Sequence, residues 1–133
     1  MAKGYFKINK EYFTEDELHK KYAEFDSIPD IKIYYDCFGT EERSMANLIC
    51  SLRENESIYI TTLEDLGLRA KSKCEILYAF SVCNCRFFIN KKEFDLSDIA
   101  QIIENGLKDS DGNIKTDSTS LEKLNNILKR FQS

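Results

Sequence analysis

Polar residues that could do chemistry stand where four predicted strands end. These positions lie near Asn9 and within residues 36–40, 62–69 and 90–94. In folds that alternate strands and helices, ligands and reacting groups gather at the carboxyl ends of the strands. The residues at this edge are therefore the first candidates for a functional site. The first strand is followed by neither the Gly-x-Gly-x-x-Gly of a dinucleotide site nor a P-loop. The sequence therefore predicts no nucleotide cofactor.

The side chains that bind metals do not form a recognisable site. The five cysteines contain no Cys-x-x-Cys pair, and the single histidine, His19, lies in a charged stretch typical of an exposed helix face. Zinc sites need ligands at short, fixed spacing, so we expect reduced cysteines, mostly in the core. Residues 109–113 resemble a calcium loop, but the glycine falls at the wrong position for an EF-hand. We predict no metal and a solvated turn there.

The elements that must position these groups alternate between strand and helix. Strands are predicted over residues 4–9, 31–35, 57–62 and 85–89. Thr14 can cap the first helix by accepting from the backbone of Glu17, and apolar spacing predicts another helix over residues 70–81. This alternation predicts an α/β fold. We expect a mostly parallel, mixed sheet of four to five strands flanked by helices, in a flavodoxin-like three-layer sandwich.

The residues after the third predicted strand carry a distinctive pattern. The run Leu63-Glu64-Asp65-Leu66-Gly67-Leu68 is similar to the Leu-Asp-Arg-Leu-Gly-Arg of serine recombinases, the resolvase/invertase family. The opening Gly4-Tyr5-Phe6-Lys7-Ile8-Asn9 resembles that family's Gly-Tyr-Ala-Arg-Val-Ser. Arg43, followed by Leu48 and Leu52, resembles its arginine-led helix. The resemblance covers about residues 3–95 and implies a resolvase-like fold similar to the family's N-terminal catalytic domain.

The same resemblance implies a chemistry that this chain has lost. In the family, a serine after the first strand attacks the DNA phosphodiester, and the matching residue is Asn9. A carboxamide has no ionisable nucleophilic oxygen. The two arginines that hold the scissile phosphate become Asp65 and Leu68, and an aspartate would repel a phosphate. Lys7 replaces a third arginine and lacks its planar fork for phosphate.

Two positions keep the family's residue type. Arg43 matches a retained arginine, and Glu64 matches the acid of the motif. Arg69 lies one position beyond the clamp, so a shifted register would restore one arginine but not the nucleophile. We therefore expect no catalytic residue. The degenerate motif positions, which we expect to converge in space, are Lys7, Asn9, Arg43, Glu64, Asp65 and Leu68.

The C-terminal part departs from the family as well. Serine recombinases continue with one long dimer-forming helix and a helix-turn-helix domain. Here residues 96–133 read as a helical extension of a single domain spanning 1–133, divided by a polar break at residues 109–117. An apolar stripe in the last helix either packs back on the domain or forms a dimer interface, and such stripes are more often core. The interface candidates are Leu121, Leu124, Leu128 and Phe131.

Charge argues against DNA as the main partner. The formal net charge is −4, whereas non-specific duplex binding depends on phosphate neutralisation by lysine and arginine. The sequence shows no signal peptide and no apolar run of roughly 18 residues. We therefore predict a cytoplasmic protein without a membrane partner, for which DNA binding is a weak prediction.

Together these observations favour an inactive serine-recombinase-like domain that serves as an interaction or regulatory protein. It would work through self-association, as a homodimer, or by pairing with another protein. Two alternatives remain open. One is a DNA recombinase of a mobile element whose active site the motif positions misidentify. The other is an unrelated flavodoxin-like binding module.

Overall fold

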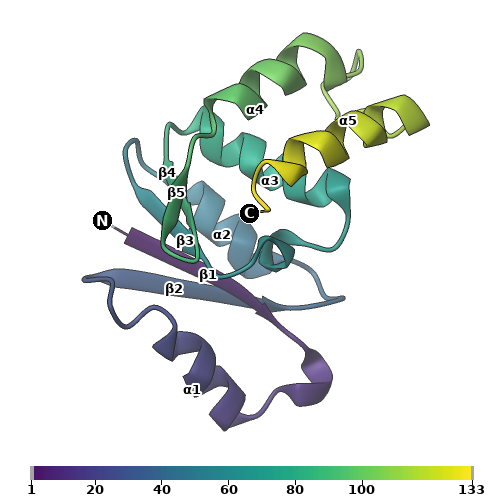
Figure 1. Cartoon of the computed structure of the whole chain (residues 1–133). Coiled ribbons are helices and arrows are strands. Elements are labelled where there is room, and N and C mark those ends of the chain that lie inside the picture. Colours follow the sequence, from purple (N-terminus) through teal and green to yellow (C-terminus); the bar gives the residue numbers. More distant parts are fainter. Residues whose placement is uncertain (1, 133) are drawn as a thin grey trace.

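The computed structural model describes residues 2–132, apart from the side chain of Tyr12. In this part of the chain, one sheet has the strand order β2-β1-β3-β4-β5. The strands are β1 (Ala2–Ile8), β2 (Ile31–Cys37), β3 (Ser57–Ile60), β4 (Arg86–Ile89) and β5 (Lys92–Phe94). The first four strands are parallel, and β5 runs antiparallel to β4. The predicted α/β fold with a mixed, mostly parallel sheet is confirmed (Figure 1).

Helices flank both faces of the sheet, but unequally (Figure 1). They are α1 (Glu15–Ala23), α2 (Arg43–Cys50), α3 (Ala70–Val82), α4 (Ser97–Ile102) and α5 (Ser118–Lys129). Short helical turns η1 (Lys10–Tyr12), η2 (Leu63–Leu66) and η3 (Ile103–Leu107) join them. Parallel strands are connected by right-handed crossovers. The step from β1 to β2 therefore places α1 on one face, and the reverse steps through α2 and α3 place these helices on the other.

Local signals in the sequence located most elements. Thr14 caps α1 as predicted, because its hydroxyl oxygen accepts from the backbone N–H of Glu17 at 3.2 Å. The predicted strand ends were off by up to two residues. The β4–β5 hairpin was not located by sequence, because its two-residue turn is Asn90-Lys91 rather than the usual Asn-Gly. Both residues have positive φ, 48° and 68°.

Two apolar clusters fill the space on the two faces of the sheet. The larger includes Tyr5, Leu48, Phe80 and Phe87 and joins the sheet to α2, α3, α4 and α5. The smaller, around Phe6, packs beneath α1. All seven residues of β1 are buried, as expected for a central parallel strand covered on both faces. No helix within residues 2–132 has the length and apolar character needed to span a membrane.

The apolar stripe of the last helix packs on the chain's own core. Leu124, Leu128 and Phe131 are buried, and Leu121 packs against them half-buried. The Phe131 ring lies 5.3 Å from that of Phe94 and meets the Phe87 ring edge-on. Of the two alternatives for this stripe, the structure shows the one in which it folds back. Burial in the chain's own core occupies Leu124, Leu128 and Phe131, whereas Leu121 keeps part of its surface exposed.

The close approach of α1 to β1 predicts the effect of a small substitution. A Cβ at Gly4 would lie 2.9 Å from Ile31 Cδ1 and 3.2 Å from the Phe25 ring. We expect Gly4→Ala to lower the free energy of unfolding by about 1–2 kcal/mol through overpacking. Gly106→Ala is the matched control, because its Cβ would meet no atom within 4 Å. Urea denaturation of both variants measures the difference, and equal stability of the two would contradict this packing.

Candidate functional site

Lys7 lies near the carboxyl end of β1, where the family resemblance places an arginine. Its Nζ donates to Glu42 Oε1 at 2.9 Å, and it lies 5.8 Å from the centre of the Phe38 ring. The lysine side chain is only 6% exposed. The ammonium group is therefore neutralised inside the protein and is not offered to an external phosphate.

Asp65 is held by backbone N–H groups rather than facing a ligand. Its Oδ1 accepts from the N–H of Lys7 at 3.1 Å, and its Oδ2 accepts from the N–H of Thr62 at 3.2 Å. Burial raises the pKa of this carboxyl group, while the N–H groups of Lys7 and Thr62 act to lower it. Asp65 joins η2 to the end of β1. The sequence suggested a charge opposing a phosphate, whereas the structure shows a buried connection.

The other motif positions do not join this pair in a catalytic arrangement. Asn9 Oδ1 accepts from the N–H of Glu11 at 3.0 Å and so caps η1. Arg43 pairs with Glu41 at 3.0 Å, and its side chain is 86% exposed. Glu64 is exposed, and Leu68 is 71% exposed. Among the six motif residues, Lys7 and Asp65 are brought together by a hydrogen bond, whereas Asn9 and Arg43 have local partners of their own.

Sequence reasoning missed a second polar connection at this edge. The Tyr5 hydroxyl donates to Asp36 Oδ2 at 2.6 Å. The same carboxylate accepts from the backbone N–H groups of Ser44 and Met45, both at 3.0 Å, in the first turn of α2. Burial, and then the hydrogen bond to Asp36, raise the pKa of Tyr5 far above its usual value. Asp36 stands several residues before α2, so no capping spacing in the sequence revealed this role.

A third polar connection lies at the other end of β1. Lys3 forms an ion pair with Glu56, and their side chains are 5% and 7% exposed. Lys3, Tyr5 and Lys7 alternate along β1 and therefore share one face of the strand. Each of these three side chains meets a carboxylate supplied by another part of the fold. Together they form the β1 polar row, which consists of Lys3, Tyr5, Lys7 and their partners Glu56, Asp36 and Glu42.

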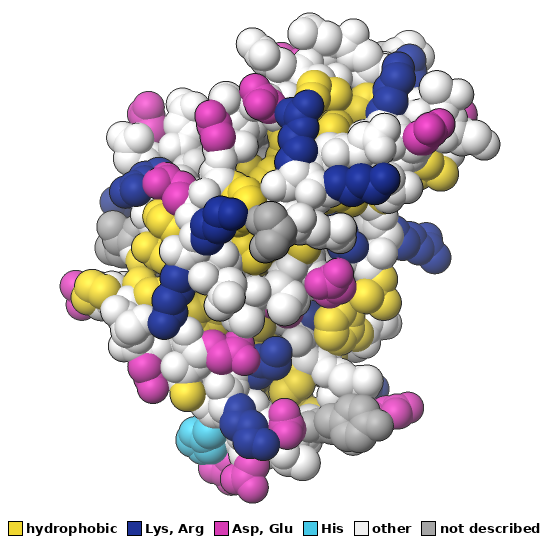
Figure 2. All heavy atoms as spheres, in the orientation of Figure 1, with side chains coloured by type: hydrophobic (Ala, Val, Ile, Leu, Met, Phe, Trp, Pro, Cys, Tyr) yellow, Lys and Arg dark blue, Asp and Glu magenta, His cyan; other side chains and the backbone are white. Residues whose placement is uncertain are grey.

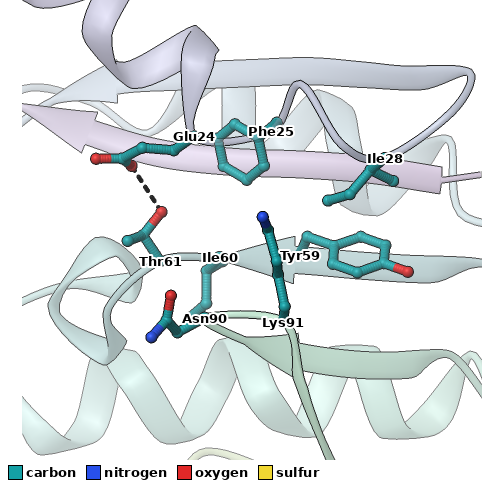
Figure 3. A pocket seen from close by; sticks show the side chains of 8 residues that line it. All are labelled: Glu24, Phe25, Ile28, Tyr59, Ile60, Thr61, Asn90 and Lys91. Atoms are coloured by element: carbon teal, nitrogen blue, oxygen red, sulfur yellow. Dashed lines mark hydrogen bonds between the residues drawn. The ribbon is translucent and has the colours of Figure 1, made fainter.

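A cavity of about 340 Å³ lies on the α1 side of the sheet. Its walls come from the segment after α1, from the end of β3 and from the β4–β5 turn (Figure 3). The lining residues are Glu24, Phe25, Ile28, Tyr59, Ile60, Thr61, Asn90 and Lys91. The Thr61 hydroxyl donates to Glu24 Oε2 at 2.7 Å. The cavity thus combines aromatic walls with an ammonium group, an amide and a carboxylate. Sequence analysis located only Asn90 and Lys91 among these residues, within the range 90–94, and assigned them no role.

Side chains that bind metals are not grouped within residues 2–132, where no set of three histidine, cysteine, aspartate or glutamate residues could hold an ion. The five cysteines are free thiols. Burial raises the pKa of Cys74 to about 12 and that of Cys85 to about 11, which makes both thiols poor nucleophiles. Asp109 accepts from the N–H groups of Asp111 and Asn113 and forms a polar turn.

Surface charge is mixed on the face shown in Figure 2, where basic and acidic side chains alternate with apolar patches. This distribution offers no continuous basic stripe on that face for a nucleic acid backbone. A search against models of known protein families found no match, and a comparison with curated proteins found none either. The site is therefore interpreted from its own geometry.

We expect the same substitution at the two lysines of the β1 polar row to lower the free energy of unfolding by different amounts. Lys3→Met leaves Glu56 buried without a counter-ion, which costs about 3–5 kcal/mol. Lys7→Met leaves Glu42, whose side chain is 34% exposed and keeps part of its hydration. We expect Lys7→Met to cost about 1 kcal/mol. Urea denaturation at neutral pH compares the two, and a larger loss for Lys7→Met would show that this assignment of burial is wrong.

Proposed function

We propose that this chain is a serine-recombinase-like domain that lacks recombinase chemistry and acts as an interaction or regulatory protein. The observation that carries the proposal is the internal use of the two central motif positions. Lys7 is engaged by Glu42, and Asp65 is engaged by the backbone of Lys7. A DNA phosphate would need free cations at this edge, and these groups supply none. The formal net charge of −4 also opposes DNA binding.

The edge that would hold DNA in a recombinase carries apolar side chains here. β1 and β3 are parallel neighbours, so the loops that follow them leave from the same edge of the sheet. Phe13 in the first loop is 44% exposed, and Leu68 in the second is 71% exposed. Leu68 also stands where the family has an arginine. We infer that a surface including Phe13 and Leu68 mediates self-association, since exposed apolar groups at a former catalytic edge favour protein contacts.

If this surface mediates self-association, replacing Leu68 by a polar residue should weaken it. Burial of a leucine contributes about 1.5–3 kcal/mol, so Leu68→Ser should weaken self-association by about tenfold or more. Val82→Ser is the matched control, because Val82 is 60% exposed but lies at the end of α3, before β4. Sedimentation velocity over a concentration series measures both variants. A chain that stays monomeric at every concentration, or equal effects of the two substitutions, would rule out this surface.

Loss of recombinase chemistry makes a second prediction. Restoring the nucleophile alone with Asn9→Ser should give no covalent protein–DNA adduct, because Lys7 and Asp65 remain committed to Glu42 and to β1. The assay incubates the wild-type and Asn9→Ser proteins with DNA and separates adducts on denaturing gels. A trapped adduct with the wild-type protein would support the alternative of an active recombinase. An adduct with Asn9→Ser alone would show that the phosphate site is still functional.

A further inference from the structure

Among the elements of residues 2–132, no helix covers β4 and β5 on the α1 side of the sheet. The crossover between β1 and β2 places α1 over those two strands, and β4 connects to β5 by a tight turn rather than by a helix (Figure 1). The chain then continues into α4 and α5, which pack with α3 on the opposite side. On the open part of the sheet, the rings of Tyr59 and Phe88 stack with their centres 4.4 Å apart.

The cavity beside α1 lies at the border of this open face. Its volume of about 340 Å³ is at the lower end of the range for small-molecule sites, roughly 300–1,000 Å³. Phe25 and Ile28 form one side, and Tyr59 with Ile60 forms the other. Aromatic walls and this volume suit a flat molecule of one or two rings.

Lys91 supplies the positive charge of this cavity. Its ammonium group extends between Phe25 and Tyr59 in Figure 3. Among residues 2–132, this ammonium group has no ion-pair or hydrogen-bond partner. The residue has a φ of 68°, a left-handed conformation that costs a side-chain-bearing residue about 1–2 kcal/mol. The two-residue β4–β5 turn imposes this conformation and so fixes where the Lys91 side chain enters the cavity.

Glu24 limits the charge that a ligand can carry. Its carboxylate lies at the opposite end of the cavity from Ile28 and accepts from the Thr61 hydroxyl (Figure 3). The negative charge of Glu24 would repel a phosphate or another dianion more strongly than a monoanion. The amide of Asn90 adds a neutral hydrogen-bonding group beside Thr61.

We propose that this cavity binds a small aromatic monocarboxylate. The ring packs against Ile28 and Tyr59, and the carboxylate accepts from the Lys91 ammonium group. A charge-assisted bond of this kind contributes more than a neutral one, while the apolar walls supply burial of the ring. This binding role goes beyond the proposed interaction function and does not depend on the Leu68 surface.

The test uses indole-3-acetate as the probe, with the full chain labelled for ¹H–¹⁵N correlation spectra. We expect saturable shifts of the backbone amides of Thr61, Asn90 and Lys91. Acetate, which lacks the ring, and tryptamine, which carries a positive charge, should each bind at least about tenfold more weakly. Absence of saturable shifts with indole-3-acetate, or equal binding of tryptamine, would overturn the proposal.

Two variants separate binding from folding. Lys91→Gln should weaken indole-3-acetate binding by about tenfold, whereas Lys92→Gln, the matched control, should not, because Lys92 does not line the cavity. Lys91→Gly removes both the ammonium group and the left-handed strain, so it should raise the unfolding midpoint while weakening binding equally. Equal affinities of the Lys91→Gln and Lys92→Gln proteins would overturn the role of Lys91.

Discussion

The burial of charged side chains along β1 is the constraint on which the rest of the fold depends. This strand is an interior one, covered on both faces, yet it places Lys3 and Lys7 on one of these buried faces with Tyr5 between them. A buried charge without a partner costs several kcal/mol. Two carboxylates therefore have to reach the lysines, Glu56 from the segment before β3 and Glu42 from the residue before α2. Asp36 of β2 accepts from the Tyr5 hydroxyl between them.

These contacts fix the arrangement of neighbouring elements as well as neutralising charge. In the ladder, Lys7 lies opposite Asp36 and Tyr5 lies opposite Tyr34. A slip of one residue would move both lysines to the face covered by α1, away from their carboxylates. Asp36 also accepts from the first turn of α2. The Asp36 carboxylate thus connects β1 to the start of α2, and internal polar contacts occupy these side chains near the carboxyl edge of the sheet.

The sequence predicted the fold more fully than the site, for a physical reason. Fold class follows from periodicity and capping, which act over a few residues, as the Thr14 cap of α1 shows. Partners of buried polar groups are long-range, and no local pattern connects Lys3 with Glu56 or Tyr5 with Asp36. Asp65 is different, because Thr62 and Asp65 have the spacing of a capping box. That spacing could have indicated an inward role before the structure was known.

An exposed leucine and a lysine in a hairpin turn lie outside the β1 polar row. The φ of 68° at Lys91 belongs to the two-residue β4–β5 turn, whereas a leucine with 71% exposure carries a cost that the fold does not require. Natural sequences tend to keep such conflicts where function needs them. Leu68 lies at the carboxyl edge, and Lys91 lies at the open half of the sheet on the α1 side. The open half exists because β5 returns by a hairpin instead of a crossover helix. The same hairpin that leaves aromatic side chains uncovered therefore also places Lys91 beside them, so one turn supplies the cavity with its ammonium group and leaves its aromatic wall open.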